Sequence, residues 1–364
     1  MTKIVNFGTL KPRMNDAACL ILENGAVFEG KFFGAGSDTT GEIVFTTGMI
    51  GYQETLTDQA YYGQIVLQTF PLIGNYGIIS EDIGNASISA KGYIVKQPCA
   101  TPSNFRSGNN LDNFLKERGV TGLYGIDTRA LTKIIRENGV MNGKISARLP
   151  AKDEMAAAIA EIKAYSIKFP IGAVSRSEVT KTGGGDRKIA ILDFGAKREI
   201  AETLASRGCE VWTFPYNTPA EEILKIKPRG VVLSNGPGDP ADQWNNGIIE
   251  TIRALDKNGA TIFGICVGHQ LLARAKGYST RKLKLGHRGE NQPVRDTRTG
   301  RVYVTSQNHG YEVIASDSSY INVNDNGCEG LDYGNSFSVQ FRPDTSGGTS
   351  FLFDRFLERA DAAK

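Results

Sequence analysis

The stretch that decides the fold is Gly264-Ile265-Cys266-Val267-Gly268-His269-Gln270. An apolar run at residues 260–263 precedes it and predicts a buried strand, whereas the segment Leu271-Leu272-Ala273-Arg274-Ala275 that follows predicts a helix. A cysteine therefore lies where a strand turns sharply into a helix. Glycines on both sides keep the backbone clear of an incoming substrate, so the pattern predicts a nucleophile elbow.

The place of Cys266 at a helix start favours a reactive thiol. Unpaired N–H groups and the helix macrodipole favour negative charge there, so they stabilise both a thiolate and an oxyanion. The alternative is a buried structural cysteine, which is what most free cysteines in cytosolic proteins are. The rest of the chain has to separate these two interpretations.

Length and composition predict a soluble globular protein of about two domains. The chain has 364 residues, of which 40% are hydrophobic and 22% charged. Its 42 Lys and Arg against 39 Asp and Glu leave a net charge of +3, with neither sign gathered in blocks. Nucleic acid and membranes are therefore not expected as partners, and small molecules or proteins are.

The cysteines predict a reducing cytoplasm. There are five, they are widely spaced, and none forms a C-x-x-C pair, which argues against a disulfide framework and against a zinc site. We therefore expect no metal on this chain. The first residues lack the apolar core of a signal peptide, and no apolar run approaches the ~20 residues that span a bilayer.

Strands and helices alternate through the second half of the chain, which predicts an α/β domain with an open, mostly parallel sheet flanked by helices. The expected strands are 188–194, 209–214, 230–234 and 261–265. The expected helices are one that contains Ile200 and Leu204, one at 219–226 and one at 248–255.

The first half is less regular and predicts a separate α+β or β-rich domain. Residues 20–30 indicate a hairpin across Asn24-Gly25, and residues 42–45 indicate another strand. Two apolar patterns of helical spacing end at Gly119 and Gly139, which are typical C-terminal caps.

These patterns give four segments. Residues 1–17 carry no clear periodicity and are expected to be an N-terminal extension. An N-terminal domain at 18–174 is followed by a polar, glycine-rich connector at 175–186 and by the α/β domain at 187–360.

A second glycine-rich turn closes the strand at 230–234. Its sequence is Ser234-Asn235-Gly236-Pro237-Gly238-Asp239-Pro240. In parallel sheets ligands bind beyond the carboxyl ends of the strands, where Cys266 is also expected. The backbone N–H groups of Gly238 and Val267 could then converge on a carbonyl oxygen that becomes an oxyanion. The alternative is an ordinary surface turn.

With the Cys266 turn, this loop resembles class I glutamine amidotransferases, which hydrolyse glutamine and pass ammonia to a partner. Further strings resemble the carbamoyl phosphate synthetase small subunit, and the likeness extends from about Ala18 almost to the C-terminus. They are Phe45-Thr46-Thr47-Gly48-Met49-Ile50-Gly51-Tyr52-Gln53-Glu54, Phe70-Pro71-Leu72-Ile73-Gly74-Asn75-Tyr76-Gly77, Gly125-Ile126-Asp127-Thr128-Arg129, Asp193-Phe194-Gly195-Ala196-Lys197-Arg198, Gly286-His287-Arg288-Gly289 and Thr305-Ser306-Gln307-Asn308-His309-Gly310-Tyr311.

The resemblance implies a glutamine site that is built largely from backbone groups. The matching positions are Gly48, Gly236, Gly238, Val267, Gln270, Asn308, Gly310 and Tyr311. Gly48 stands where some members have serine, so a hydroxyl contact is absent and an N–H contact remains. Gln270 can offer amide groups to an amino-acid head group, although a helix residue in water is the simpler interpretation.

The sequence departs from the family at the catalytic triad. After a strand like Ser338-Val339-Gln340-Phe341 the family has His-Pro-Glu, whereas this chain has Arg342-Pro343-Asp344. The resemblance thus implies Cys266 as nucleophile, with Arg342 and Asp344 at the positions of histidine and glutamate. A protonated guanidinium cannot accept the proton of the thiol.

Two alternatives concern this departure. The segment 344–350 is shorter than in the family, so a small deletion could have removed His-Pro-Glu. The chain's three histidines, His269, His287 and His309, match other family positions. We do not expect His269 or His309 to replace the missing imidazole; the His269 side chain, three residues past the cysteine, should follow the helix face.

The resemblance implies a small subunit that binds L-glutamine and supplies ammonia to a large subunit, which uses ATP, Mg²⁺ and bicarbonate for arginine and pyrimidine synthesis. No cofactor is implied on this chain. One rival is a scaffold or regulatory subunit that binds the large chain without supplying ammonia. Another is an unrelated cysteine hydrolase, or an amidotransferase serving another synthase, which leaves the N-terminal strings unexplained.

Overall fold

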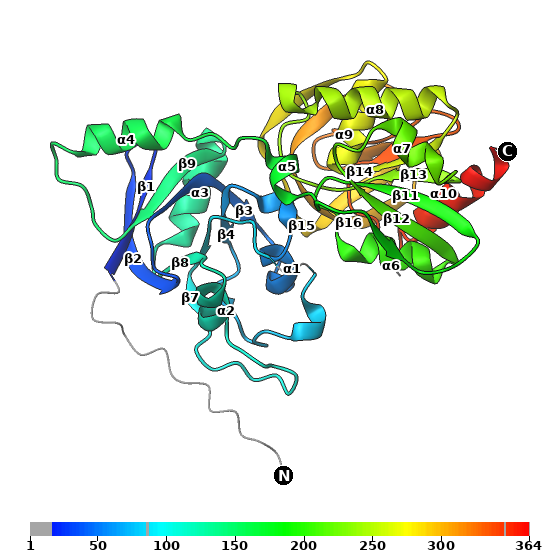
Figure 1. Cartoon of the computed structure of the whole chain (residues 1–364). Coiled ribbons are helices and arrows are strands. Elements are labelled where there is room, and N and C mark those ends of the chain that lie inside the picture. The colour runs from blue at the N-terminus through cyan, green and yellow to red at the C-terminus, as the bar shows by residue number, and fades with distance from the viewer. Residues whose placement is uncertain (1–16, 85–86, 346, 364) are drawn as a thin grey trace, which may run out of the picture. The chain divides into compact units, whose positions relative to one another are not determined.

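The computed structural model describes residues 17–84, 87–345 and 347–363 (Figure 1). The chain separates into two compact units, residues 1–168 and 169–364, each with its own apolar core. The expected extension at 1–17 lies outside the described residues except for Ala17, which begins the first strand. No described helix combines the length and the apolar character that crossing a bilayer requires.

In the N-terminal unit, seven of the described strands close into a barrel in the order β1-β2-β8-β6-β4-β3-β9. The neighbours among β3, β4, β6 and β8 are parallel, and the other pairs are antiparallel. The barrel strands are β1 Ala17–Leu22, β2 Val27–Gly34, β3 Thr39–Thr46, β4 Gln64–Gln68, β6 Gly92–Val95, β8 Thr121–Tyr124 and β9 Met141–Ser146. A small parallel pair is formed by β5 Leu72–Ile73 and β7 Gln97–Pro98.

The helices of this unit are short. They are α1 Tyr52–Leu56, α2 Leu111–Glu117, α3 Thr128–Asn138 and α4 Met155–Ala164, with 3₁₀ turns η1 Gln59–Tyr61 and η2 Ser80–Asp82. The expected hairpin is present, with Ile21 paired to Val27 and Gly25 at φ 88°. The residues after α2 and α3 that the sequence marks as caps, Gly119 and Gly139, both have positive φ.

The C-terminal unit is built on a ten-stranded sheet in the order β10-β12-β11-β13-β14-β19-β18-β16-β15-β17. Its strands are β10 Thr180–Thr182, β11 Arg187–Asp193, β12 Cys209–Pro215, β13 Gly230–Leu233, β14 Thr261–Ile265, β15 Ser279–Asp296, β16 Val302–Ile314, β17 Tyr320–Asn322, β18 Cys328–Asp332 and β19 Phe337–Val339. The α/β class expected from the alternating pattern is confirmed.

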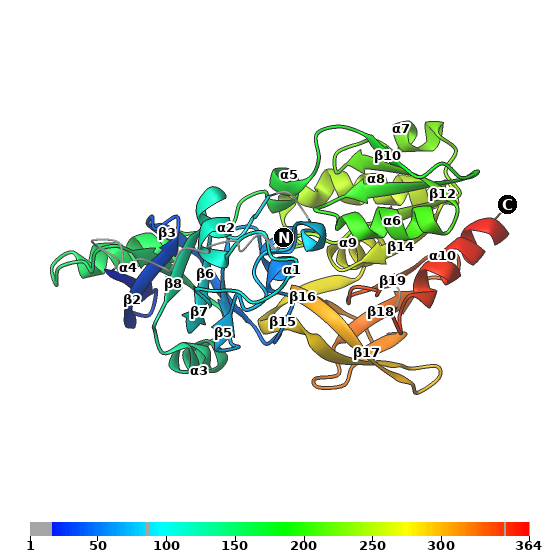
Figure 2. The same cartoon turned by 90° about the horizontal axis from the view of Figure 1, so that it is seen from below.

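Parallel pairing is confined to the centre of this sheet. It joins β12, β11, β13, β14 and β19, whereas β10 on one side and β18, β16, β15 and β17 on the other pair antiparallel. The long strands β15 and β16 form a ribbon, drawn in yellow and orange tones (Figure 2). The sheet is therefore less parallel than expected, because the strands β15 to β18 between residues 279 and 332 carry no periodicity that the sequence analysis recognises.

Helices cover both faces of the parallel centre. They are α5 Pro170–Val174, α6 Arg198–Ser206, α7 Ala220–Lys225, α8 Asn246–Lys257, α9 Val267–Ala275 and α10 Phe351–Ala362, with η3 Gln243–Asn245. Along β11, Ile189 and Ile191 pack in one core with α6 and α10, while Ala190 and Leu192 pack in the other with α7, α8 and α9. This alternation explains why the strand sequence is continuously apolar.

The polar stretch 175–186, expected to be a connector, contains a strand. Residues Thr180–Thr182 form β10 and pair with β12, so the stretch belongs to the edge of the C-terminal sheet. The two units instead divide between residues 168 and 169. Threonine favours strands because its side chain is branched at Cβ. The glycines nearby give the stretch the overall composition of a flexible linker, so this local preference for a strand is easily missed.

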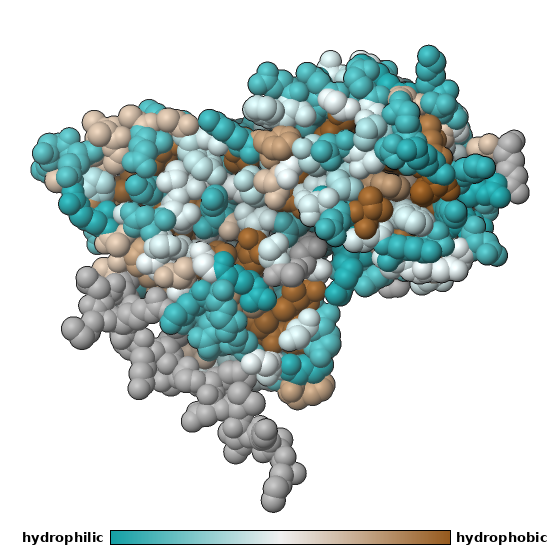
Figure 3. Space-filling view, viewed as in Figure 1, coloured by the Kyte–Doolittle hydropathy of each residue, from teal (hydrophilic) through white to brown (hydrophobic). Residues whose placement is uncertain are grey.

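Large apolar side chains are mostly inside the two units. On the face drawn in Figure 3, hydrophilic residues predominate and apolar residues form small patches. Phe105, at 97% exposure, is the most exposed large apolar residue described.

Candidate functional site

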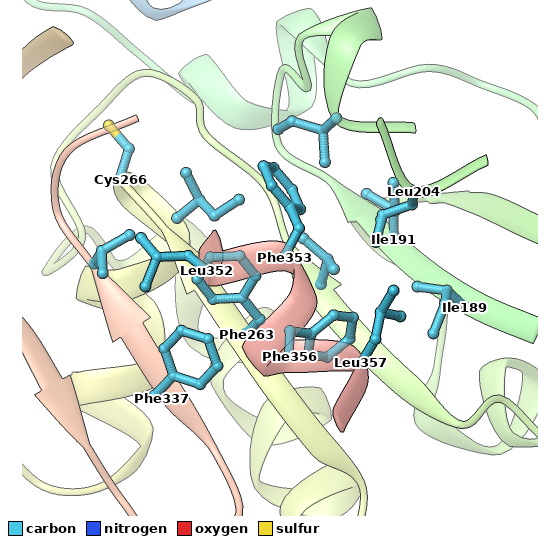
Figure 4. Packing of buried hydrophobic residues seen from close by; sticks show 14 of the residues in the cluster. Ile189, Ile191, Leu204, Phe263, Cys266, Phe337, Leu352, Phe353, Phe356 and Leu357 are labelled. Atoms are coloured by element: carbon cyan, nitrogen blue, oxygen red, sulfur yellow. The ribbon is translucent and has the colours of Figure 1, made fainter. Parts of the chain in front are cut away.

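Cys266 lies between the last residue of β14 and the first of α9, as the sequence predicts. Its backbone is at φ 57° and ψ −111°, a conformation that residues other than glycine rarely adopt. Its N–H donates to Val339 O at 2.9 Å, which ties the turn to the neighbouring strand β19. Figure 4 shows its sulfur pointing away from the rings of Phe263 and Phe337.

The flanking glycines are required by packing. A Cβ on Gly264 would lie 2.7 Å from Gly268 O, and a Cβ on Gly268 would lie 2.2 Å from Leu233 O. The Gly268 N–H donates to Ser234 O at 3.1 Å. The turn therefore rests directly on the end of β13, which brings the two glycine-rich loops together at one edge of the sheet.

Glycine usually lowers stability relative to alanine, but the strain at Cys266 predicts the opposite order for substitutions at this position. Cys266→Gly should unfold with a free energy about 1–2 kcal/mol higher than Cys266→Ala, because only the alanine keeps a Cβ at positive φ. Both tryptophans, Trp212 and Trp244, lie in this unit, so their fluorescence during urea unfolding reports it. As a control, Ala201→Gly in α6 should lower stability, by roughly 0.5–1 kcal/mol. A less stable glycine variant at 266 would show that the turn carries no such strain.

The loop at 234–240 also needs its glycines. A Cβ on Gly236 would lie 2.0 Å from Phe194 O, and Gly238 has φ 105°. The Asn235 side chain holds the loop, since it accepts from Lys197 N at 3.1 Å and donates to Gly195 O at 3.1 Å. The loop is thus a fixed part of the sheet edge, which a freely variable surface turn would not be.

Gly238 and Val267 are the expected oxyanion donors. Val267 is the first residue of α9, so its N–H has no acceptor within the helix. Gly238 lies in the loop that Ser234 O anchors to the Cys266 turn. Their roles as oxyanion donors remain predictions.

Three of the expected glutamine-binding residues lie around Cys266. Asn308 O is 3.7 Å from Cys266 Sγ, and Gln270 Nε2 donates to Tyr311 O at 2.7 Å and to Gln340 Oε1 at 2.8 Å. Gln270 is 2% exposed, so it is a buried residue and not the solvated helix residue of the simpler interpretation. Its amide donors already serve β16 and the residue after β19.

Two further expected residues lie at different places. Gly310 is on β16 between Asn308 and Tyr311. Gly48 is in the N-terminal unit, two residues after β3, where its carbonyl oxygen accepts from the side chain of Gln68. As a glycine, it offers no side-chain hydroxyl.

Arg342 lies at the same edge of the sheet, three residues after β19 ends. Its N–H donates to Ser306 O at 2.9 Å, which fixes the backbone there against β16. Its side chain borders a cavity of about 190 Å³ whose walls also include Lys197, Glu199 and Ile265, the residue before Cys266. A cation therefore borders this cavity, at the position where the sequence resemblance implies an imidazole.

Asp344 is held within its own loop. Its Oδ2 accepts from Thr349 Oγ1 at 2.9 Å and from Thr349 N at 3.3 Å, and its own N–H donates back to Thr349 Oγ1 at 2.8 Å. Through these hydrogen bonds the carboxylate closes the turn before α10.

Sequence reasoning gave no role to several residues of this cavity. Glu199, in the first turn of α6, has a buried Oε2 without a hydrogen-bond partner among the described residues. Ser306 and Lys197 complete the polar wall. The signal for them was their position: each follows or faces the carboxyl end of a central strand, where ligands bind in such sheets.

The structure gives no support to His269 or His309 as a replacement base. His269 is fully buried, its Nδ1 lies 2.8 Å from Ser338 Oγ, and its Nε2 has no hydrogen-bond partner among the described residues. His309 uses Nδ1 toward Tyr311 O and Nε2 toward Gln307 Oε1. Burial lowers the pKa of His269 to about 3, so it stays neutral in the folded protein.

The lowered pKa of His269 predicts a loss of stability in acid. As the pH falls below the ordinary histidine value of about 6.5, the unfolded chain binds a proton that the folded chain refuses until about pH 3, so stability falls across that window. The slope is about 1.4 kcal/mol per pH unit. His269→Asn, which keeps a polar group near Ser338, should reduce the slope by that amount in tryptophan-monitored urea unfolding. Parallel curves would contradict the assignment, and the comparison cancels the similarly lowered pKa of His309.

Comparisons with known proteins account for both units. A family model for "Carbamoyl-phosphate synthase small chain, CPSase domain" matches residues 20–145, and one for "Glutamine amidotransferase class-I" matches residues 190–359. The N-terminal match excludes the interpretation of the chain as an unrelated cysteine hydrolase.

Curated relatives match almost the whole chain. The carbamoyl phosphate synthase small chain of Fusobacterium nucleatum is 47% identical and that of Clostridium perfringens 46%; each match covers 94% of this chain, and 98% and 99% of those proteins. The pyrimidine-specific small chain of Bacillus subtilis is 43% identical over 95% of this chain and 96% of that protein. The chain therefore belongs to the family of carbamoyl phosphate synthase small chains.

Proposed function

We propose that this chain binds L-glutamine and hydrolyses it to glutamate and ammonia for a large subunit that uses ATP, Mg²⁺ and bicarbonate. Arginine and pyrimidine synthesis are the proposed destinations of the product. The strained turn at Cys266 carries this proposal. A residue other than glycine at φ 57° lowers the stability of the fold, and such strain is typical of positions that have a function. The family membership supports it.

The proposed reaction begins with attack of the Cys266 thiolate on the carboxamide carbon. A C–S bond forms while the carbonyl electron pair moves to the oxygen, which the N–H groups of Gly238 and Val267 stabilise. Collapse of this intermediate expels ammonia, which requires a proton, and leaves a thioester that water cleaves to glutamate. No cofactor on this chain takes part.

The proposed contacts to glutamine remain those of the family. They are Gly48, Gly236, Gly238, Val267, Gln270, Asn308, Gly310 and Tyr311. The closeness of Asn308 O to Cys266 Sγ, at 3.7 Å, supports the β16 part of this set. So does the bond from Gln270 to Tyr311 O, which joins α9 to the same strand.

Proton transfer is the weak step of this reaction. Arg342 stays protonated, so it favours the thiolate by charge but can neither take the thiol proton nor protonate departing ammonia. General acid–base help contributes about 10²–10⁴ in rate. Slow glutamine hydrolysis is the consequence that we propose for this chain.

The second candidate function is a scaffold or regulatory subunit that binds the large chain and supplies no ammonia. One feature favours it: Arg342, whose backbone is bridged to Ser306, stands at the position where the sequence resemblance implies a catalytic histidine. Fold and partner binding can persist after catalysis is lost, because function depends on the site.

The two candidates are separated by the nitrogen source. The full chain is assembled with a large subunit of the family, and carbamoyl phosphate formed from glutamine is compared with that formed from ammonium. The proposal expects a measurable glutamine-dependent rate that Cys266→Ala or alkylation of Cys266 removes, with the ammonium rate unchanged. If the unchanged complex forms carbamoyl phosphate from glutamine no faster than the Cys266→Ala complex, the proposal of glutamine hydrolysis is wrong and the scaffold function is the one supported.

A further inference from the structure

Three side chains that the proposed reaction does not use meet on neighbouring strands in the antiparallel part of the C-terminal sheet. They are His287 on β15, His309 on β16 and Glu329 on β18. One ligand atom of each lies within 4.8 Å of the others. His287 Nδ1 is 3.4 Å from Glu329 Oε1, and the two imidazole rings are nearly perpendicular, with centroids 4.9 Å apart.

Both histidines turn one ring nitrogen inward and engage the other outward. His287 Nε2 lies 2.9 Å from Asp325 Oδ2, and His309 Nδ1 lies 2.8 Å from Tyr311 O. Histidines that ligate a metal almost always donate their second N–H to a carboxylate or a backbone carbonyl in this way. The inward atoms are then His287 Nδ1 and His309 Nε2.

Glu329 supplies an independent observation. Its side chain is 1% exposed, its Oε1 accepts from Asn322 Nδ2 at 3.0 Å, and its Oε2 has no hydrogen-bond partner among the described residues. Burying a carboxylate oxygen without a hydrogen-bond partner is costly. A cation in front of Oε2 would remove that cost.

The hydrogen-bond pattern of His309 is compatible with a cation beside Gln307. When His309 Nδ1 donates to Tyr311 O, a neutral ring has a lone pair on Nε2, and this nitrogen lies 3.0 Å from Gln307 Oε1, another acceptor. Two acceptors at this distance need a rotated amide or a cation that both can ligate. Gln307 is 2% exposed, so bulk water does not serve there.

We propose that His287, His309 and Glu329 bind one zinc ion, with Gln307 Oε1 as the fourth ligand. Nitrogen and oxygen ligands at about 2.0–2.2 Å from tetrahedral zinc lie about 3.4 Å from one another. One ligand atom of each of the three residues lies within 4.8 Å of the others, so these separations shorten by at most about 1.4 Å. The separation of His309 Nε2 from Gln307 Oε1, 3.0 Å, lengthens slightly. The cysteine spacing predicts no zinc site, because it cannot relate histidines and a glutamate on three strands.

The site would fasten β15, β16 and β18 beside the segment that faces Cys266. Tyr311 O, which accepts from His309, also accepts from Gln270 Nε2 at 2.7 Å. The ion would therefore hold the orientation of His309 and, through that carbonyl, the packing of α9 on β16.

The test uses Zn²⁺ and Co²⁺ alone with the full chain. The chain is first stripped of metal with a chelator, then incubated with Zn²⁺ and passed through gel filtration. It should retain about one zinc per molecule. With Co²⁺ in place of Zn²⁺ it should show the visible absorption bands of a tetrahedral ion. Glu329→Gln and His287→Asn should weaken binding at least about 100-fold, and Asp325→Asn about 10–100-fold. Glu312→Gln is the control: this buried glutamate of β16 pairs with Arg281 and takes no part in the trio, so its variant should bind zinc normally.

Failure of the wild-type chain to retain zinc, or equal binding by Glu329→Gln, would overturn the proposal and leave a buried histidine–carboxylate pair. The wild-type measurements need no variant, and tryptophan-monitored unfolding shows which variants fold. Neither readout depends on glutamine hydrolysis, so this inference and the proposed function can fail separately.

Discussion

Replacement of Arg342 by histidine together with Asp344 by glutamate is expected to raise glutamine-dependent carbamoyl phosphate synthesis by about 10²–10⁴. The imidazole can accept the proton of Cys266 and return one to departing ammonia, which a guanidinium cannot. The measurement is the rate of the assembled complex with glutamine as nitrogen source. The rate with ammonium should stay the same, because it bypasses this subunit.

The structure provides the room for this change. The Arg342 backbone is fixed by its bond to Ser306 O, and the arginine side chain borders a cavity of about 190 Å³ next to Ile265. A smaller imidazole fits where the longer side chain is now. The glutamate at 344 has one more methylene than Asp344, which lengthens its reach beyond the loop that Thr349 closes.

The control is Arg342→Gln with the same change at Asp344. It removes the positive charge and supplies no base, so its glutamine-dependent rate should stay at or below that of the unchanged chain. A rate equal to that of the histidine variant would mean that charge alone limits the reaction. No gain in either variant would point to the deletion alternative, in which the loop at 344–350 is too short to place any triad.

The parts of the fold that the sequence predicts are those set by local periodicity. The alternation from β11 to α9, with Cys266 at the last turn, follows from apolar runs and glycine caps within a few residues of one another. The barrel closure does not, because β9 pairs with β1 and β3 from far along the chain. Long-range pairing leaves no mark in a short window of sequence.

The candidate site shows the same limit. Cys266 and the loop that contains Gly238 carry their own glycine signals, which reflect close backbone contacts. Glu199 carries none, since an acidic residue in the first turn of a helix is common and only the folded sheet turns it toward Arg342's cavity. His287 and Glu329 are likewise ordinary residues until three strands bring them together.

Substitution of Gly268 by alanine is expected to lower the free energy of unfolding of the C-terminal unit by at least about 3 kcal/mol. The new Cβ would lie 2.2 Å from Leu233 O and 2.6 Å from Leu233 C. These are backbone atoms of β13, which is held on both sides by β11 and β14, so they cannot yield as a flexible side chain would. Tryptophan fluorescence during urea unfolding measures the loss.

The matched control is Gly247→Ala in α8. The same Cβ there meets nothing within 4 Å, so this variant should be unchanged or more stable by less than about 1 kcal/mol. If Gly268→Ala unfolded like Gly247→Ala, α9 could shift away from β13 at little cost, and the Gly268–Ser234 bond would not fix the Cys266 turn. In that case the strain at Cys266 would relax with the helix, and the proposed nucleophile would lose the support that holds it above the sheet edge.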